Sequence, residues 1–388
     1  MDVSEETRRL EKLESDRFFA TVNQYIKLFG VEHLHKKDFF FGQALSRISV
    51  NCPIDWSELH RLIEEVRSYA DWYPVFRANA ERFGRLAAEA ESKKRFVTAG
   101  QHYLRASLLY HYAILYLREE DPNRAEGLRK KIAYYIKGCR YYDPPAEPVK
   151  IPFGGFEIPA YFRVPIHTGK SPCLVMIDGA NSTKEEFHNW STEFLKRGVA
   201  TLTFDGPGQG ELAVKQGGPK MELRKYHEVV AALIDYVQAR KEINPDRIGL
   251  FGQSLGGWLG AWTAAHDPRA KCFVSMGGFY DFRDFPRIPL VVQEEVSAVF
   301  GIESVTEGRA YMKEHCSLRG IASRIKCPSL ILHGARDDLV STPELRQLAD
   351  EIGAHAEIIV WEDGSHGATN RNLEAAPVMA DWVSEKLR

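Results

Sequence analysis

The chain lacks the features that would place it in a membrane or on nucleic acid. In its 388 residues, no apolar run approaches the ~18 residues that a membrane-spanning helix requires. The formal net charge is −2, so no basic excess indicates nucleic acid or an anionic membrane as a partner. The first residues, Met-Asp-Val-Ser-Glu-Glu, are charged where a secretory signal would be apolar. We therefore expect a cytoplasmic protein that binds neither membranes nor nucleic acid.

Cysteine is scarce and scattered, and no Cys-x-x-Cys pair or zinc-ligand spacing is present. We interpret the cysteines as reduced core residues and expect neither a metal nor another cofactor. The glycine-rich stretch 204–211 also lacks both the P-loop pattern and the dinucleotide-binding pattern. We interpret it as a tight loop that shapes the rim of a pocket. The cysteines are Cys52, Cys139, Cys173, Cys272, Cys316 and Cys327.

The sequence does have an ordinary globular composition, with 44% apolar and 27% charged residues, and a length that suits two or three domains. Residues 1–143 show helical periodicity, and Asp55-Trp-Ser-Glu58 resembles a capping box. Pro74 is expected to break one helix. A proline-rich stretch at 143–148 marks a domain boundary. We therefore predict a helical N-terminal cap domain over 1–143 and a catalytic domain over 144–388. Further helices are expected over 75–92, 96–119 and 122–139.

The second part of the chain alternates strands and helices. Two strands around Gly154-Gly155 predict a hairpin. Continuous apolar runs that alternate with helices are typical of a doubly wound, mostly parallel sheet. The stretch 279–326 is too long for a simple loop, and we expect it near the carboxyl ends of the strands, where such sheets bind ligands. The predicted strands are 149–152, 158–164, 173–177, 199–204, 248–251, 272–276, 329–332 and 356–361, with helices at 184–196, 221–240, 257–266 and 291–299.

Residues 247–261 are the stretch around which this alternation is organised. A short buried strand leads into Gly252-Gln-Ser254-Leu-Gly256, and a helix of small residues follows. This is the strand–turn–helix context that a G-x-S-x-G nucleophile elbow needs. The turn holds the serine in a strained backbone conformation and projects its hydroxyl above the sheet. We predict that Ser254 is a catalytic nucleophile.

A serine hydroxyl needs a base, and the base needs a third group that orients it. Sheet hydrolases of this topology supply them in the order Ser, acid, His. Asp337 follows a strand and is the favoured acid, with the adjacent Asp338 as the alternative. His366 lies in a glycine-flanked loop after the last strand and is the predicted base. By contrast, His333 is interpreted as a packed residue and His355 as a solvated one.

Two backbone amides should meet the negative charge that develops on the substrate oxygen. One is the N–H of Leu255, next after the nucleophile, and the other is assigned to Ala180 in the turn after strand 173–177. We also expect Gly179, Trp258 and Tyr280 to contact the substrate. Four tyrosines of the helical part could line a flat substrate, although a core role is favoured for most of them, as it is for His102 and His111. These tyrosines are Tyr103, Tyr110, Tyr112 and Tyr116.

With these motifs placed, the chain resembles the α/β-hydrolase family that includes 2,6-dihydroxypseudooxynicotine hydrolase and the hydrolases that process polyketides in fungal pigment and toxin pathways. The shared stretches are 178–186, 204–211, 252–257 and 277–279, with 99–106 in the helical part. The resemblance implies that a helical domain lies over the catalytic sheet and that the enzyme hydrolyses a carbon–carbon bond beside a ketone. It also implies a small aromatic or polyketide-type substrate. Asp178 departs from the glycine of the nicotine-pathway member.

Two other functions remain open at this point. The same serine, aspartate and histidine would serve an esterase, a lactonase, or an acyl-transfer or cyclising enzyme equally well. The other alternative is a non-catalytic binding protein that retains the hydrolase fold. The presence of the serine, the aspartate and the histidine argues against this alternative. The motifs do not name the substrate, and they leave a homodimer open as the state of assembly.

Overall fold

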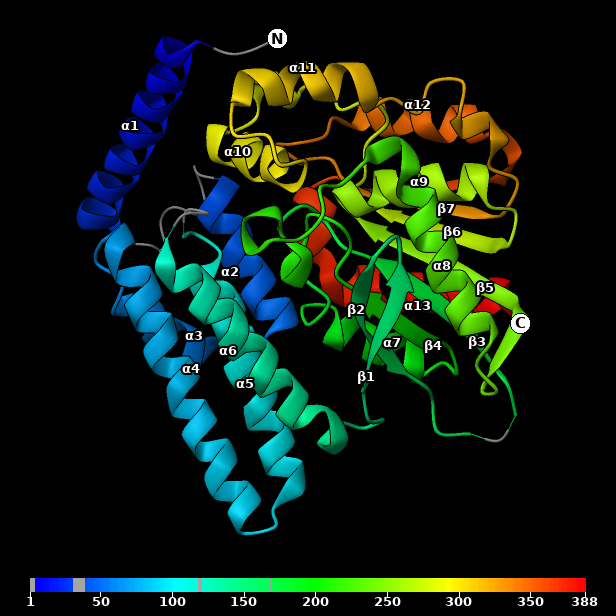
Figure 1. Cartoon of the computed structure of the whole chain (residues 1–388), viewed down its shortest axis with the longest axis horizontal. Helices are drawn as coiled ribbons and strands as arrows, with labels where there is room; N and C mark the ends of the chain where they lie inside the picture. Colours follow the sequence, from blue (N-terminus) through cyan, green and yellow to red (C-terminus); the bar gives the residue numbers. More distant parts are fainter. Residues whose placement is uncertain (1–3, 31–38, 118–120, 168) are drawn as a thin grey trace. The chain divides into compact units, whose positions relative to one another are not determined.

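The structure is a computed structural model that describes residues 4–30, 39–117, 121–167 and 169–388. It divides into two compact units. One unit comprises Met1–Ala146 with Pro289–Val292, and the other comprises Glu147–Ile288 with Gln293–Arg388. The first unit is helical where it is described, and the second holds a large sheet (Figure 1).

Long helices build the first unit, and α4, α5 and α6 pack against one another in sequence order. Two helix starts follow the sequence signals. Asp55 caps α3 by accepting a hydrogen bond from the Glu58 N–H at 2.8 Å, and Asp121 caps α6. The helices are α1 (Glu5–Phe29), α2 (Phe39–Asn51), α3 (Trp56–Glu64), α4 (Tyr69–Ser92), α5 (Phe96–Ile114) and α6 (Pro122–Gly138).

The predicted helix break at Pro74 is wrong. The break lies at residues 65–68, and Pro74 stands inside α4. A proline inside a helix removes one backbone hydrogen bond. Here the neighbouring side chains offset that loss, because Trp72 and Phe76 are almost fully buried and their rings stack with centroids 4.2 Å apart. Tertiary packing therefore overrides the local signal.

The tyrosines of α5 and its C-terminal turn are core residues. Tyr103, Tyr110 and Tyr112 expose at most 1% of their surface, and Tyr116 exposes 4%. The hydroxyl groups of Tyr103, Tyr110 and Tyr112 are hydrogen-bonded inside the unit; for example, the Tyr112 hydroxyl donates to the Arg47 carbonyl at 3.0 Å. Burial of this kind stabilises the helical unit and agrees with the core interpretation of these residues.

In the described residues, the second unit holds an eight-stranded sheet in the order β1-β2-β4-β3-β5-β6-β7-β8. The β1–β2 and β2–β4 pairs are antiparallel and every other pair is parallel. The predicted doubly wound, mostly parallel sheet is confirmed, and the hairpin turns at Gly154-Gly155. The strands are β1 (Glu147–Phe153), β2 (Phe156–Arg163), β3 (Ser171–Ile177), β4 (Ala200–Phe204), β5 (Ile243–Gln253), β6 (Ala270–Met276), β7 (Ser329–Gly334) and β8 (Ala356–Trp361).

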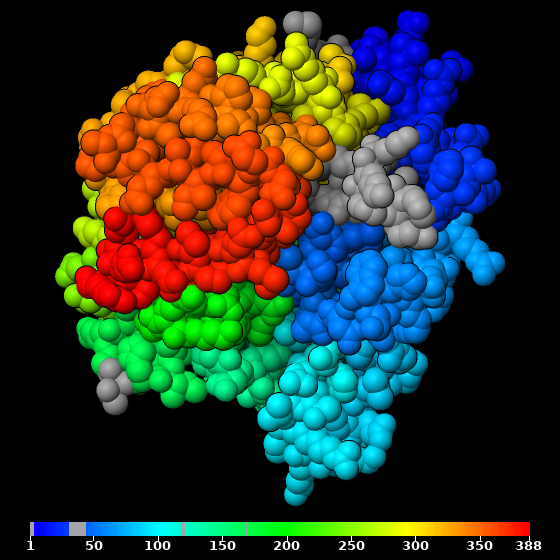
Figure 2. Space-filling view, turned by 180° about the vertical axis from the view of Figure 1, so that it is seen from behind, coloured from blue at the N-terminus to red at the C-terminus, as the bar shows by residue number. Residues whose placement is uncertain are grey.

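Helices cover both faces of this sheet. On one face α7 (His188–Leu195) packs against α13 (Asn372–Lys386), and Figure 2 shows the red surface of α13 beside the green surface of α7. On the other face α8 (Tyr226–Gln238) packs against α9 (Leu255–His266), while α12 (Thr342–Ile352) contacts β7 and β8. With both faces covered, the central strands are almost continuously buried, which explains their unbroken apolar sequence.

The excursion over 279–326 contains two α-helices, α10 (Leu290–Val299) and α11 (Val305–His315). The sequence predicted the first but not the second. Only Val305, Gly308 and Met312 are buried on α11, so its apolar stripe is too sparse to stand out as a helical period. Its start is nevertheless capped, because the Ser304 hydroxyl accepts the Glu307 N–H at 3.3 Å.

Candidate active site

Ser254 occupies a sharp turn between β5 and α9. Its backbone has φ 54° and ψ −121°, a conformation that residues with a side chain rarely adopt. Strain of this kind costs roughly 1–3 kcal/mol and persists only where surrounding contacts enforce it. Here the Ser254 N–H donates to the Met276 carbonyl at 2.9 Å, and the Ser254 carbonyl accepts the Gly257 N–H at 2.8 Å.

The turn is tight enough to require glycine on both sides of the serine. A Cβ on Gly252 would lie 2.0 Å from the Gly256 carbonyl oxygen. A Cβ on Gly256 would lie 2.2 Å from the Ile177 carbonyl oxygen at the end of β3. Both distances involve backbone atoms that cannot move aside. The Gly-x-Ser-x-Gly spacing is therefore a steric requirement of this turn.

Asp337 and His366 meet at the carboxyl ends of β7 and β8. The Nδ1 atom of His366 lies 2.7 Å from Oδ2 of Asp337. The other carboxylate oxygen, Oδ1, accepts the N–H groups of Leu339 at 2.8 Å and Val340 at 3.0 Å. A carboxylate only accepts hydrogen bonds, so Nδ1 of His366 is the donor when this pair holds a carboxylate. Backbone bonds also tie the two loops together, as the Ala335 N–H donates to the Trp361 carbonyl at 2.8 Å.

The His366 loop and the Ser254 turn pack on the same strand end. The Met276 carbonyl accepts the Ser254 N–H, and the next residue, Gly277, lies against the histidine loop. A Cβ on Gly277 would stand 2.7 Å from the Gly367 nitrogen and 3.4 Å from Cε1 of His366. The fold therefore brings Ser254, Asp337 and His366 to one edge of the sheet.

The alternatives to these residues lie elsewhere. Asp338 is exposed, and its carboxylate interacts electrostatically with both Asp337 and His366. His333 is fully buried, its Nε2 lies 3.2 Å from the Thr342 hydroxyl, and its Nδ1 is 3.8 Å from Asp337. Burial lowers the pKa of His333, which favours the neutral ring. His355 is exposed in the short turn before β8.

The loop after β3 runs beside the serine. A Cβ on Gly179 would lie 3.4 Å from Cβ of Ser254 and 3.3 Å from the Gln253 carbonyl oxygen. Ala180 follows directly and is partly exposed. On the other side of the serine, Leu255 begins α9, so its N–H has no acceptor within the helix. The Ala180 amide follows Gly179 and the Leu255 amide follows Ser254. Gly179 and Ser254 approach each other closely at this edge of the sheet, so both amides assigned to the oxyanion hole lie beside that approach.

Two residues assigned to the substrate are packed inside the protein. Trp258 is fully buried and stacks on Trp262 with ring centroids 5.3 Å apart. Tyr280 is 4% exposed, and its hydroxyl donates to Glu351. Burial raises the pKa of Tyr280 to about 12, with the bond to Glu351 adding to the shift. Substrate contact by either ring stays a prediction.

Asp178 is a buried acid beside the candidate oxyanion loop. It has no exposed surface, and within the described part of the chain neither carboxyl oxygen has a hydrogen-bond partner. Burial raises the pKa of Asp178 well above its ordinary value, and the nearby carboxylates of Asp205, Glu186 and Glu185 raise it further. The folded protein therefore favours the neutral form of this side chain.

Replacing Asp178 with asparagine should make the folded protein more stable at neutral pH. Above pH 3.8 the unfolded chain ionises this acid while the folded chain retains its proton, so the wild-type free energy of unfolding falls as pH rises. The fall is roughly 1.4 kcal/mol per pH unit between the two pKa values. Urea unfolding between pH 4 and 8 measures it. Asp178→Asn should lose that slope, and the exposed Asp350→Asn should keep it; parallel curves for all three proteins would contradict the assignment.

A buried polar cluster behind the site was missed by sequence reasoning. The Lys184 ammonium lies 2.7 Å from Asp205, 3.0 Å from Glu185 and 2.5 Å from Glu211. In the same cluster the buried Gln209 contacts the loop that holds Gly179. The only sequence signals were the glycine-rich stretch 204–211 and the charged residues that follow β3, and neither reveals which side chains turn inward.

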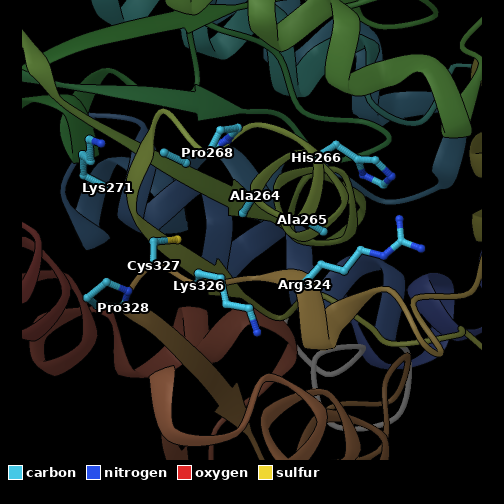
Figure 3. A pocket seen from close by; sticks show the side chains of 10 residues that line it. Ala264, Ala265, His266, Pro268, Lys271, Arg324, Lys326, Cys327 and Pro328 are labelled. Atoms are coloured by element: carbon cyan, nitrogen blue, oxygen red, sulfur yellow. The ribbon is translucent and has the colours of Figure 1, made fainter.

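A separate cavity of about 360 Å³ lies at the opposite end of α9. It is lined by His266, Lys271, Arg324 and Lys326 among others, close to the amino ends of β6 and β7 (Figure 3). Since α9 has 12 residues, this end is about 18 Å from Ser254. Figure 3 shows the ends of Lys271 and Arg324 on opposite sides of the cavity, so its cations do not converge on one point.

No group of three or more His, Cys, Asp or Glu side chains within the described residues is placed to hold a metal ion. None of the helices in the described ranges is both long and apolar enough to span a bilayer.

The sheet order, the strained serine turn and the aspartate–histidine pair define the class of protein. A doubly wound sheet that carries these groups at the carboxyl ends of its strands has the α/β-hydrolase fold.

Comparison with known proteins agrees. Residues 185–388 match the prolyl oligopeptidase family. The chain is 30% identical over 340 residues to 2,6-dihydropseudooxynicotine hydrolase of Paenarthrobacter nicotinovorans, which covers 84% of this chain and 91% of that one. It is also 28% identical over 357 residues to 20-hydroxy-prefusarin hydrolase of Gibberella moniliformis, which covers 79% and 84% of the two chains. The crystal structure of 2,6-dihydroxy-pseudo-oxynicotine hydrolase superposes with a TM-score of 0.82 at 28% identity, covering 88% of this chain and 95% of that one.

The chain belongs to the prolyl oligopeptidase family of α/β-hydrolases, and it is a hydrolase. Its likeness to 2,6-dihydropseudooxynicotine hydrolase extends beyond the sheet, because the matched share exceeds the length of the second unit. The family resemblance expected from the motifs is thereby confirmed.

Proposed function

We propose that this protein is a serine hydrolase that cleaves a carbon–carbon bond beside a ketone in an aromatic or polyketide-type small molecule. The observation that carries the proposal is the 2.7 Å bond between His366 and Asp337 at the sheet edge that also holds Ser254. Similarity over most of the length of 2,6-dihydropseudooxynicotine hydrolase, helical region included, supports the substrate class.

In the first step His366 acts as a general base. With its hydrogen held on Nδ1 by Asp337, the imidazole takes the Ser254 proton on Nε2 while the serine oxygen attacks the ketone carbon. Asp337 stays ionised and stabilises the imidazolium that forms. The N–H groups of Ala180 and Leu255 then stabilise the negative charge on the former carbonyl oxygen.

In the second step the carbon–carbon bond breaks. Its electron pair enters an enolate or a phenolate, and the His366 imidazolium returns the proton to that leaving group. An acyl phenol reaches this arrangement through its dienone tautomer, in which the ring carbon bearing the acyl group is tetrahedral. Water, activated by His366, then hydrolyses the acyl-Ser254 ester and releases the carboxylic acid.

The mechanism requires a leaving group that can delocalise the electron pair, and matched compounds test this requirement. We expect 1-(2,6-dihydroxyphenyl)butan-1-one to give butanoic acid and 1,3-dihydroxybenzene, identified by mass spectrometry. The control, 1-phenylbutan-1-one, lacks the ring hydroxyls and cannot form the dienone, so it should react at least ~10³-fold more slowly, a barrier difference of about 4 kcal/mol.

Phenyl butanoate tests the alternative that the protein is an esterase. Its leaving group is phenoxide, which carries the charge on oxygen and needs no carbanion stabilisation, so any active serine hydrolase of suitable shape can cleave it. Turnover of the ester together with inert ketones, β-diketones included, would assign the protein to the esterases instead. Inertness of the whole panel, combined with tight binding of any member, would point to a binding protein.

A further inference from the structure

The glycine-rich loop after β4 sends one side chain beneath the candidate oxyanion loop. The side-chain amide nitrogen of Gln209 donates to two successive carbonyl oxygens, that of Asp178 at 2.9 Å and that of Gly179 at 2.6 Å. Gln209 is 1% exposed, so these bonds do not compete with water. One buried amide group thus holds the backbone directly before Ala180.

The orientation of the Gln209 amide is fixed by a second buried residue. The Tyr226 hydroxyl donates to Oε1 of Gln209 at 3.2 Å, and Tyr226 is 1% exposed. In the flipped orientation, Oε1 would face two carbonyl oxygens and neither would receive a hydrogen bond. Gly206 makes room for the pair, because a Cβ there would lie 2.3 Å from the tyrosine oxygen.

The loop that carries Gln209 is itself anchored. Asp205, which has no exposed surface, accepts the N–H groups of Lys184 and Glu211, each at 2.9 Å, and binds the Lys184 ammonium at 2.7 Å. These bonds connect the start of the loop after β4 with the end of the loop after β3. Gln209 therefore projects from a rigid base.

Peptide geometry links this clamp to the proposed catalysis. In a trans peptide the C=O and the following N–H point in opposite directions. Holding the Gly179 carbonyl toward Gln209 therefore fixes the Ala180 N–H away from Gln209. The same bond polarises the peptide and makes its N–H a stronger donor. Gly179 also lies against Ser254, since a Cβ on this glycine would be 3.4 Å from Cβ of the serine.

We propose that Gln209 is a positioning residue for the oxyanion hole, acting through the Gly179–Ala180 peptide and oriented by Tyr226. The proposal rests on the proposed function, in which the Ala180 N–H meets the oxyanion. It assigns a task to the stretch 204–211, for which the sequence indicated only a tight loop.

The test compares Gln209→Met, which keeps the length of the side chain but removes both polar atoms, with Gln216→Met at an exposed position in a short 3-10 helix. With p-nitrophenyl butanoate as the probe, Gln209→Met should lower kcat about 10- to 100-fold, somewhat less than complete loss of an oxyanion donor, with KM changed less than threefold. Gln216→Met should match the wild type. Tyr226→Phe should lower kcat in the same direction by a smaller factor, and it tests the idea if Gln209→Met fails to fold.

A binding measurement separates positioning from a structural role. Butaneboronic acid forms a tetrahedral adduct with an active-site serine and mimics the oxyanion, whereas butanoate mimics only the product. Gln209→Met should weaken the boronate by the same factor as kcat and leave butanoate affinity unchanged. Equal weakening of both, or unchanged boronate affinity, would overturn the proposal.

Labelling of the wild type by a fluorophosphonate keeps the two proposals distinct. Labelled Ser254 together with an insensitive Gln209→Met variant removes the positioning role alone. An unlabelled Ser254, with turnover that survives its replacement, removes the proposed function and the positioning role with it.

Discussion

Ser254→Ala should abolish turnover of whichever carbonyl substrate the wild type hydrolyses, with kcat lower by about 10⁴- to 10⁶-fold. The strained turn holds this residue beside Gly179 and hydrogen-bonded to the end of β6. Alanine fits the same backbone but offers no oxygen to attack the carbonyl carbon. Steady-state kinetics measure the loss, and intact-protein mass spectrometry should show a fluorophosphonate adduct on the wild type and none on the variant.

Ser275→Ala is the matched control. Ser275 lies on the neighbouring strand β6, is fully buried, and within the described residues its hydroxyl has no hydrogen-bond partner. The substitution removes the same atom one strand away, and activity should stay within about threefold of the wild type because no bond is lost. Turnover by Ser254→Ala within tenfold of the wild type would refute the nucleophile assignment.

The second large effect is expected for Asp337→Asn, with kcat about 10⁴-fold lower, as for the same change in a serine protease triad. The backbone N–H groups of Leu339 and Val340 bind Oδ1 and would hold the asparagine oxygen in that position. Its NH₂ group would then face Nδ1 of His366. The ring must accept that bond on Nδ1, which moves its own hydrogen to Nε2, where no lone pair is left for the Ser254 proton.

Asp338→Asn provides the control for this experiment. The two variants change the net charge equally and lie at adjacent positions, but Asp338 is exposed. We expect it to keep activity within about threefold of the wild type, with an unfolding midpoint close to that of Asp337→Asn. If Asp338→Asn proves the more damaging change, the acid has been assigned to the wrong residue.

Much of the fold could be predicted from the sequence because its signals are local. Unbroken apolar runs such as 173–177 mark buried parallel strands, and the glycine spacing around Ser254 marks the turn. Boundaries were less accurate. β5 begins at Ile243, not at residue 248, because its early residues pair with β3 through a register shift that no periodicity reveals. Likewise, the aromatic packing around Pro74 keeps α4 continuous.

The candidate site, like the fold, was predicted only in part from the sequence. Glycine-flanked loops after strands drew attention to Ser254, Asp337 and His366, and the structure brings their loops together, while their catalytic roles stay predictions. Gln209 and Tyr226 could not be predicted, because glutamine and tyrosine are ordinary residues for a loop and a helix start. That the helical unit acts as a cap is likewise a prediction from family resemblance.

The sequence by itself determined the strand–helix alternation, the serine turn and the family, since each depends on residues within a few positions of one another. Only the tertiary structure decided that Asp337 lies 2.7 Å from His366, 29 residues away, and 3.8 Å from the nearer His333. It also decided that Asp178 is buried beside other acids and that Gln209 reaches the backbone 30 residues before it. Contacts between distant residues depend on how the sheet and its loops pack in three dimensions, and local periodicity does not predict that packing.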